Sequence, residues 1–513
     1  MKKSLFIAVV VSLGGFLFGF DAGIISGVMA YAGPEFGLTD LQNGWAVSAP
    51  TFAAMITMLF TGRLSDIIGR KKILVVVALL YAVSALTSAY ATGYHMLWIA
   101  RFIGGIAFGA ALIIAPIYIA EISKAEGRGK LVSVQQLNIV LGFFAAFLSN
   151  YYFNKAFSGG ESTFLTDENV WRWMLGVEFI PAIVYFILMF FVPKSPRWLF
   201  TQNSNEEARK ILIGMHGEEM GNEEANAIVE SLNDANKEEA KVKLSDLFKP
   251  ALKFVLTVGI IIGILQQVTG INAIYFYATS IFKQTGIGTD AAFSSGVLLS
   301  FTTVVFTIIA MMLIDKMGRR PLLLYGIAGI AISLLICAYG FNQATYQLTE
   351  EDIANFTFTE KVKLSSMAGK LYDGDVEFKN ALKEALGNQA YLDNEGAIIE
   401  SAVTMNATLV LIGILGFIAC FAFSLGPVMW VLLSELFPNR YRGLAIGFVA
   451  FLNSFSSWIV QFIFPWELSN FGNAISFGIF GVIALLGFFV FLKILPETKG
   501  KSLEQIEKDL VRN

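Results

Sequence analysis

The chain has 513 residues, of which 55% are hydrophobic and only 15% are charged, and its mean hydropathy is +0.64. Its apolar residues come in blocks of about twenty, which is typical of a membrane protein with several spans and excludes an ordinary soluble domain. The net charge of −3 gives no reason to expect nucleic acid as a partner. Two cysteines and two histidines offer neither a disulfide framework nor a histidine-ligated metal centre, so we expect no cofactor.

The first apolar block resembles a signal peptide, because "MKKSLFIAVVVSLGG" has a basic start followed by an apolar run. No convincing small-residue cleavage pattern follows it, and the apolar run continues to about Tyr31. A segment of that length can span a bilayer, so we expect it to be retained as the first transmembrane helix.

Twelve blocks have the length of a transmembrane helix, which predicts an all-α membrane protein. They lie near residues 5–31, 42–62, 72–92, 95–120, 130–153, 171–192, 251–282, 290–314, 320–342, 404–433, 443–465 and 472–494. The connections "GRLSDIIGRKK", "SKAEGRGK", "DKMGRRP" and "NRYRG" are short and basic, and they fall on one side of the predicted membrane. By the positive-inside rule that side is cytoplasmic, and both termini lie there.

Two polar segments interrupt this pattern. Residues 195–250 carry charges in a helical pattern, as in "SNEEARKIL", and divide the spans six and six. We interpret them as a cytoplasmic helical linker between an N-terminal half, residues 1–194, and a C-terminal half, residues 251–495. A cytoplasmic tail, residues 496–513, follows. Residues 341–403 lie on the external side, with helical periodicity in "VEFKNALKEAL". We expect a solvated insertion there, and the alternative is a lid over the entrance.

The two halves repeat a charged pattern in their basic connections. Its members are Asp66, Arg70, Glu121 and Arg128 in the first half, and Asp315, Arg319, Glu435 and Arg442 in the second. The offset grows from 249 to 314 residues along the chain, because the external insertion lies between the second copies. Duplicated halves are the usual plan of secondary transporters. Opposite charges at matching helix ends can hold an inward gate closed, whereas the simpler interpretation is positive charge that only sets topology.

Six motifs follow one another along the chain. They are "GRLSDIIGRKK", "RFIGGIAFGAALIIAPIYIAEIS", "PKSPRWL", "QQVTGINAIYFYATSIF", "GPVMWVLLSELFPNRYRG" and "PETKGKSLEQIE". Together they resemble the sugar porter family of the major facilitator superfamily, across essentially the whole chain. The resemblance implies two pseudo-symmetric six-helix halves and a monosaccharide substrate, as in xylose/proton symporters and glucose facilitators. Lys194 replaces the acid of the family's usual Pro-Glu-Ser-Pro-Arg, a change that we do not expect to alter the substrate.

Asp21 stands inside the first apolar block, in "GFLFGFDAGIISGVM". A charge at mid-membrane costs roughly 2.5–3.5 kcal/mol, so Asp21 needs a polar cavity or a partner. The candidate partner is Arg101, in the fourth span. Arginine keeps its proton, so the carboxylate must be the group that titrates if the pair does. The resemblance implies proton coupling as well, since proton-coupled sugar porters have these two residues and an acid at the position of Glu178. The alternative is a structural ion pair.

Five positions of the second half match residues that contact sugar in this family. They are Gln266, Gln267, Asn272, Trp430 and Asn453. Amide and aromatic side chains suit the hydroxyls and the C–H face of a neutral sugar. Gln266 and Asn272 would lie about 120° apart on a regular helix, so their convergence needs a break, which Gly270 permits. The Gly-Pro pair at 426–427 similarly favours a kink before Trp430. The alternative for these side chains is hydrogen bonding between helices.

Two positions depart from the pattern of relatives that bind glucose or xylose. Phe143 stands where those relatives have a glutamine in the fifth span, and Thr303 stands where they have an asparagine in the eighth. Losing two polar contacts changes which hydroxyls of a sugar can be satisfied. The identity of the sugar therefore stays open.

These observations predict proton-coupled symport of a monosaccharide by alternating access, in the cytoplasmic membrane of a bacterium. The carrier is expected to be monomeric, with the sugar, the proton and the lipid bilayer as its partners. A facilitative uniporter of the same fold is the first alternative. A sugar sensor is disfavoured by the short tail, and a membrane enzyme by the lack of a visible nucleophile with its base, a metal cluster or a phosphate loop.

Overall fold

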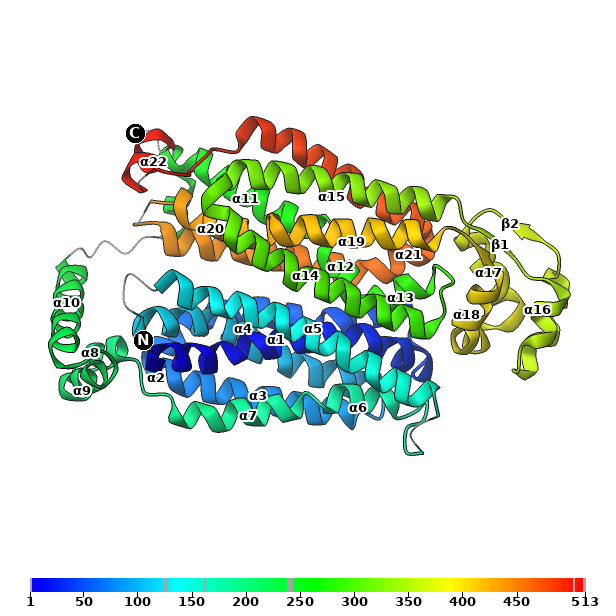
Figure 1. Cartoon of the computed structure of the whole chain (residues 1–513), viewed down its shortest axis with the longest axis horizontal. Coiled ribbons are helices and arrows are strands. Elements are labelled where there is room, and N and C mark those ends of the chain that lie inside the picture. Colours follow the sequence, from blue (N-terminus) through cyan, green and yellow to red (C-terminus); the bar gives the residue numbers. More distant parts are fainter. Residues whose placement is uncertain are drawn as a thin grey trace.

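The protein is a bundle of long helices with a smaller unit at each end (Figure 1). The structure is a computed structural model that describes residues 2–123, 128–160, 163–237, 243–438, 440–501 and 503–510. Within these residues, ten helices are long and apolar enough to cross a membrane. One of them, α21 (Arg442–Ile494), contains two spans, because Gly472 interrupts it with a φ of 80°. Together with α5 (Arg128–Ser158), they give the twelve spans that hydropathy predicts.

The first half occupies the lower part of the bundle in Figure 1. Its helices are α1 (Lys2–Glu35), α2 (Asp40–Ile68), α3 (Arg70–Ala89), α4 (Tyr94–Ile122), α5, α6 (Val170–Gly176) and α7 (Phe179–Phe191). Close contact between α1 and α5 requires glycine. A Cβ at Gly19 would lie 2.0 Å from the backbone oxygen of Ile139, and one at Gly142 would lie 2.1 Å from that of Phe16. Small residues let membrane helices approach in this way, and here they fix the part of α1 that carries Asp21.

The second half forms the upper part of the bundle. Its helices are α11 (Lys253–Val268), α12 (Ile271–Phe276), α13 (Ala278–Lys283), α14 (Thr289–Met317), α15 (Arg319–Asn342), α19 (Ala407–Phe423), α20 (Leu425–Leu436) and α21. Two spans of this half are broken. The segments α11, α12 and α13 follow one another along one of them, and α19 and α20 share the other.

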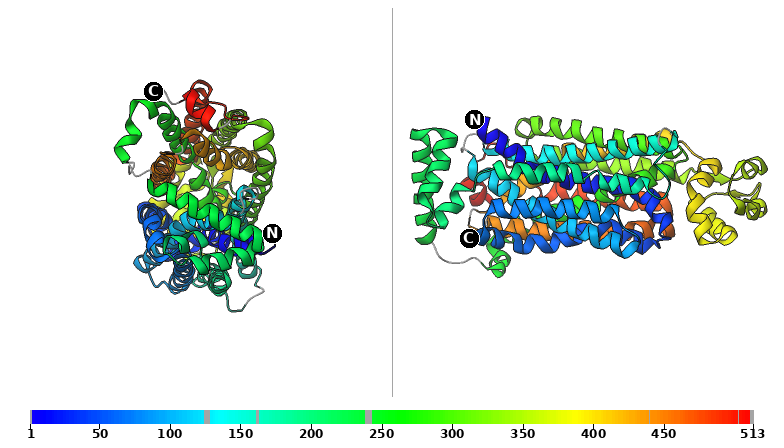
Figure 2. Two further views of the ribbon diagram at one scale, coloured as in Figure 1. Left: turned by 90° about the vertical axis from the view of Figure 1, so that its left-hand side faces the viewer. Right: turned by 90° about the horizontal axis from the view of Figure 1, so that it is seen from below.

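Both termini and the linker lie at the same end of the bundle (Figures 1 and 2). We call it the basic end because the described residues of the four basic connections lie there; residues 124–127 and Asn439 of these connections lie outside the described residues. The linker is helical, as its charge pattern predicts. Its elements are α8 (Pro196–Thr201), α9 (Asn205–His216), α10 (Glu218–Lys237) and the 3-10 turns η1 (Leu244–Phe248) and η2 (Pro250–Leu252). The tail forms a further short helix, α22 (Leu503–Leu510), which was not predicted.

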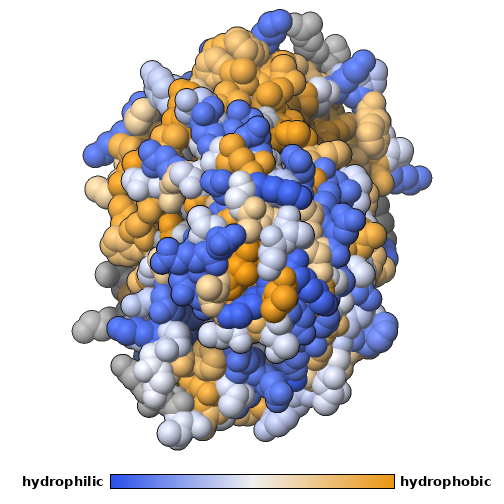
Figure 3. Space-filling model, turned by 90° about the vertical axis from the view of Figure 1, so that its right-hand side faces the viewer, coloured by the Kyte–Doolittle hydropathy of each residue, from blue (hydrophilic) through white to orange (hydrophobic). Residues whose placement is uncertain are grey.

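At the opposite end, residues 345–404 form a folded unit that we call the cap (Figure 1). Its elements are β1 (Thr345–Gln347), α16 (Glu350–Asn355), η3 (Thr359–Met367), β2 (Leu371–Tyr372), α17 (Asp375–Leu386), α18 (Asn388–Ala402) and β3 (Val403–Thr404). The strands pair antiparallel in the order β2-β1-β3, over a small core of its own that includes Phe378. Helix α17 confirms the helix that the periodicity of "VEFKNALKEAL" predicts. The sheet was not predicted, because strands of two or three residues show no alternation. Hydrophilic residues cover much of this end of the molecule (Figure 3).

Candidate functional site

A buried ion pair lies in the first half. Arg101 Nη1 on α4 lies 3.2 Å from Asp21 Oδ1 on α1, and the two side chains are only 2% and 5% exposed. Arg101 Nε also donates a hydrogen bond of 3.2 Å to the carbonyl oxygen of Ala46 on α2. The guanidinium therefore links three helices. The structure brings the two predicted partners together, and their part in proton transfer stays a prediction.

A second acid lies beside this pair. Glu178 is 2% exposed and stands at the break between α6 and α7. Its carboxyl group is close enough to interact electrostatically with both Asp21 and Arg101. Two acids and one arginine give the pocket a net negative charge when both acids are ionised, and none when either holds a proton. Because an unbalanced charge is costly to bury, the pocket is suited to take up one proton.

Amide side chains of the second half form a continuous hydrogen-bond network. Gln267 Nε2 donates to Gln266 Oε1 at 3.1 Å and to Asn453 Oδ1 at 3.2 Å. Gln267 Oε1 in turn accepts from Asn272 Nδ2 at 2.8 Å. Gly270 makes this convergence possible, since its φ of 86° lies in the left-handed region and separates α11 from α12. The predicted break at Gly270 is confirmed.

Three residues that the sequence prediction missed extend this network to the first half. Ser457 Oγ accepts from Asn272 Nδ2 at 2.6 Å and from Gln461 Nε2 at 2.7 Å. Gln461 Oε1 accepts from Thr51 Oγ1, on α2 of the first half, at 2.9 Å. Ser457 and Gln461 follow Asn453 along α21 at intervals of four residues, so all three lie on one buried face. That spacing was the signal that could have revealed them.

Trp430 lies apart from the amide network. It belongs to α20 and is 40% exposed. The helix break before it falls at Ser424, with φ −127° and ψ −95°, two residues ahead of the predicted Gly-Pro pair at 426–427. An aromatic ring with free surface can pack on the C–H face of a sugar. The role of Trp430 in binding stays a prediction.

The two positions that depart from the pattern of glucose and xylose carriers meet at one side chain. The ring centroid of Phe143, on α5, lies 5.0 Å from the ring centroid of Tyr275, on α12. Thr303 Oγ1, on α14, shares a hydrogen bond with the Tyr275 hydroxyl. An apolar ring of the first half therefore packs against the second half at this point, and the Thr303 hydroxyl is engaged within the protein.

Polar contacts between the two halves gather near the cap end. Ser26 on α1 and Thr279 on α13 share a hydrogen bond of 3.0 Å. Asp290, in the first turn of α14, accepts from Asn154 Nδ2 at 2.5 Å and from Ser158 Oγ at 3.0 Å, both on α5. These contacts hold the halves together on the cap side of the bundle.

At the basic end, the charge cluster of the first half ties helix ends within that half. Arg70 Nη1 lies 2.8 Å from Asp66 Oδ1, and Arg70 Nη2 lies 3.0 Å from Glu121 Oε1. Ser195, at the start of the linker, donates to the other oxygen of Glu121. Arg128 begins α5, but its side chain lies outside the described residues.

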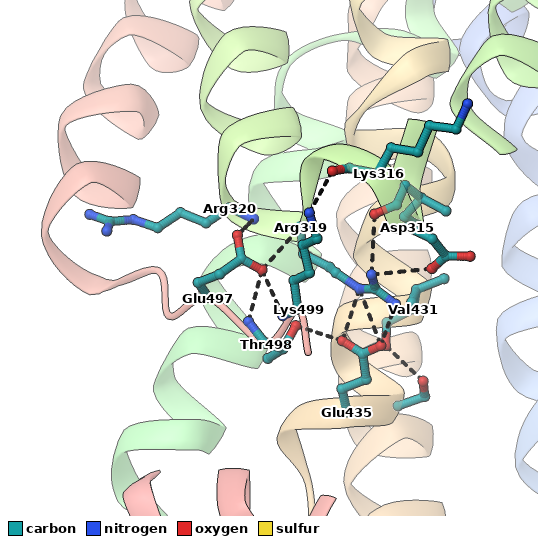
Figure 4. Close-up of polar contacts among 11 residues, drawn as sticks. Asp315, Lys316, Arg319, Arg320, Val431, Glu435, Glu497, Thr498 and Lys499 are labelled. Atoms are coloured by element: carbon teal, nitrogen blue, oxygen red, sulfur yellow. Dashed lines mark hydrogen bonds and ion pairs between the residues drawn. The ribbon is translucent and has the colours of Figure 1, made fainter. Parts of the chain in front are cut away.

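The cluster of the second half repeats this arrangement (Figure 4). Arg319 Nη2 lies 2.7 Å from Glu435 Oε1, and Arg319 Nη1 lies 3.3 Å from Asp315 Oδ1. Glu497 of the tail, which was not predicted, accepts from the Arg319 backbone N–H at 3.1 Å. Arg442 donates to a backbone carbonyl at the end of α20. Both clusters brace their own half in this conformation, and their gating role stays a prediction.

Comparison with known proteins decides the family. The family described as "Sugar (and other) transporter" matches residues 7–359 and 390–510. The chain belongs to this family. Among curated sugar transporters, the arabinose-proton symporter of Bacillus subtilis strain 168 is 34% identical over 97% of this chain and 92% of its own length. The D-xylose-proton symporter of Escherichia coli strain K12 is 29% identical over 98% of this chain and 94% of its own.

Solved structures of sugar transporters agree with this assignment. The partially occluded inward open conformation of the xylose transporter XylE from E. coli is 26% identical, with a TM-score of 0.74 over 98% of this chain and 100% of that one. XylE bound to 6-bromo-6-deoxy-D-glucose is 28% identical, with a TM-score of 0.71 over 99% of each chain. The twelve-helix major facilitator fold and the resemblance to sugar porters are thereby confirmed.

Proposed function

We propose that this sugar transporter carries a monosaccharide and a proton together into a bacterium, by alternating access across the cytoplasmic membrane. The observation that carries the proposal is the buried pair of Asp21 and Arg101 with a second acid, Glu178, beside it. The names of the arabinose-proton and D-xylose-proton symporters support both a sugar and a proton as cargo. The carrier acts as a monomer, since one chain supplies both halves and the whole site, and it performs no covalent chemistry.

The orientation follows from charge. The basic connections gather at the end that holds both termini, and the positive-inside rule places that end in the cytoplasm. The cap then lies outside the cell.

The proton acts on the links between helices of the first half. With Asp21 ionised, Arg101 binds both Asp21 on α1 and the backbone of α2, so these helices are tied to α4. A neutral carboxyl attracts a guanidinium more weakly than a carboxylate does. Proton uptake by Asp21 therefore loosens this link, while Glu178 remains to balance the charge of Arg101. The helices can then shift without leaving an unpaired buried charge.

The sugar acts on the amide network of the second half. Gln267 is hydrogen-bonded to both Asn272 and Asn453, and Asn453 Nδ2 also donates to Gln266 Oε1, so these amides hold one another in place. A sugar with suitably placed hydroxyls can exchange these bonds for its own without leaving a buried polar group unpaired. A sugar that lacks a matching hydroxyl leaves one unpaired, and the site rejects it.

The test compares coupled and uncoupled transport in proteoliposomes. A counterflow screen of pentoses and hexoses first identifies a transported sugar. Asp21→Asn should then retain counterflow of that sugar but lose accumulation driven by a pH gradient, because the pocket stays neutral. Asp167→Asn, which changes an exposed acid in an external connection, should retain both. Accumulation by Asp21→Asn would disprove the coupling assignment, and uptake by the unmodified protein without proton uptake would identify a uniporter.

A further inference from the structure

The cap is joined to the second half by its two chain connections and by polar contacts. It is inserted between α15 and α19, both of which belong to the second half. Asp375 Oδ2, at the start of α17, accepts from the backbone N–H of Asn473 at 3.0 Å and from its Nδ2 at 2.8 Å, beside the break in α21. Gln284 Nε2, just after α13, donates to Glu395 Oε1 on α18 at 3.1 Å. The cap is thus fixed at three separate places on the second half.

Helix α18 of the cap also contacts the first half, and Gln389 makes a hydrogen bond to it. Gln389 Nε2, in the first turn of α18, donates to the carbonyl oxygen of Pro34, at the end of α1, at 3.1 Å. The same amide donates to Asp393 Oδ1, one turn along α18, at 2.9 Å, which holds it in this orientation. Its oxygen points to the connection after α1, since a Cβ at Gly37 would lie 3.1 Å from Gln389 Oε1. Helix α18 therefore spans the boundary between the halves.

Two acids of helix α18 lie near a lysine at the contact between the two halves. Lys283 Nζ, at the end of α13, lies 5.7 Å above the ring of Tyr31 on α1, so an ammonium of the second half faces an aromatic ring of the first. Glu395 and Glu400 on α18 are close enough to Lys283 to attract its ammonium electrostatically. The acids of the cap therefore help to hold this ammonium where it faces the first half.

We propose that the cap is an external latch, in which Gln389 joins the second half to the first and stabilises the outward-closed conformation. Opening to the outside must separate the halves at this end. Because the cap moves with the second half, opening also withdraws Gln389 from Pro34. The family match omits residues 360–389, so this part of the cap, which ends at Gln389, is an addition to the family pattern. A single neutral hydrogen bond in contact with solvent shifts such an equilibrium by about two- to tenfold rather than locking it. The inference rests on the proposed alternating access.

The separation of the halves can be measured without any sugar. Spin labels attached through Tyr90→Cys, after α3, and Tyr339→Cys, near the end of α15, would lie at the external ends of the two halves on exposed positions. The two native cysteines are first removed by Cys337→Ala and Cys420→Ala. Electron paramagnetic resonance of the purified, reconstituted protein then gives the ratio of outward-open to outward-closed molecules.

Two glutamine variants distinguish a latch from general support by the cap. Gln389→Ala should raise the outward-open fraction relative to the closed one by about two- to tenfold. Gln347→Ala is the matched control, because its amide donates at 2.9 Å to the backbone oxygen of Gly369 inside the cap. It should leave the ratio unchanged. An unchanged ratio in Gln389→Ala, or an equal rise in both variants, would overturn the latch.

A cross-link provides a second measurement that depends on transport. Gly37→Cys with Gln389→Cys, joined by a short thiol-reactive spacer, should stop counterflow, and reduction should restore it. The pair Gln347→Cys with Gly369→Cys, both within the cap, should not affect counterflow when joined. Free counterflow with the first pair joined would overturn the latch. If the unmodified protein showed no counterflow of any sugar while the spin-label ratio still responded to Gln389→Ala, the latch would stand and the proposed function would fail.

Discussion

Removing both acids of the buried pocket should destabilise the protein far more than removing either one. The side chain of Arg101 is 2% exposed, and its charge is balanced by Asp21 at 3.2 Å and by Glu178 nearby. In Asp21→Asn, Glu178 remains as counter-ion, and in Glu178→Gln the pair of Asp21 and Arg101 remains intact. Each single variant therefore leaves a neutral pocket and should lose only about 1 kcal/mol, as an ordinary substitution does. The double variant leaves a buried guanidinium without a partner, which costs about 3–5 kcal/mol.

The assay is a double-mutant cycle on the free energy of unfolding, measured by denaturant titration in detergent micelles. The interaction energy between the two substitutions should be about 1–3 kcal/mol, within the range for residues that share a partner. The matched control is Asp315→Asn with Glu435→Gln around Arg319, whose side chain is 12% exposed at the end of the bundle, against 2% for Arg101 inside it, so that water can reach the remaining charge. That cycle should be additive within about 0.5 kcal/mol. An additive result in the buried pocket would refute the view that the two acids share one arginine.

Two further substitutions test packing and binding. Gly19→Val should lower the free energy of unfolding, measured by thermal denaturation, by about 1–3 kcal/mol, because the new side chain would push against the backbone of α5. Gly447→Ala is the control, since this helical glycine has open space around it, and it should leave the free energy of unfolding unchanged. Ser457→Ala should raise the sugar concentration that gives half-maximal counterflow by about 5- to 100-fold, because two amides lose a hydrogen-bond partner. Ser434→Ala, which removes only a bond to the serine's own helix, should leave it unchanged; equal losses in both serine variants would argue against a role for Ser457.

Hydropathy and the rules for charge in membranes account for the parts of the fold that could be predicted. Spans are local properties of the sequence, so their number and order follow from composition alone. The contact between Asp21 and Arg101 was predictable because an intramembrane acid needs a partner and few ionisable side chains are available. Gly270 was predictable because two amides separated by six residues cannot converge on a regular helix.

Features that depend on tertiary structure escaped prediction. Ser and Thr side chains in helices commonly bond to their own backbone, so Thr51 gives no sign of a longer-range contact until α2 and α21 are placed. The kink before Trp430 moved to Ser424, whose hydroxyl bonds to the carbonyl oxygen of Cys420 in the preceding turn. The contact from Gln389 to Pro34 joins residues more than 350 positions apart, and no periodicity reports such a pairing.

Coupling requires that the sugar bind the two conformations with different affinity, because a ligand shifts an equilibrium only by that difference. The hydrogen bond between Thr51 and Gln461 is a place where the difference can arise, since it joins the two halves and ends the amide network. Separation of the halves at this point would break this bond, and Gln461 would lose one of the partners that position Ser457 and Asn272. The network then presents a different set of free donors and acceptors to the sugar. Under the proposed function, the external closure and the amide network form one connected system, in which a change at either end alters the other.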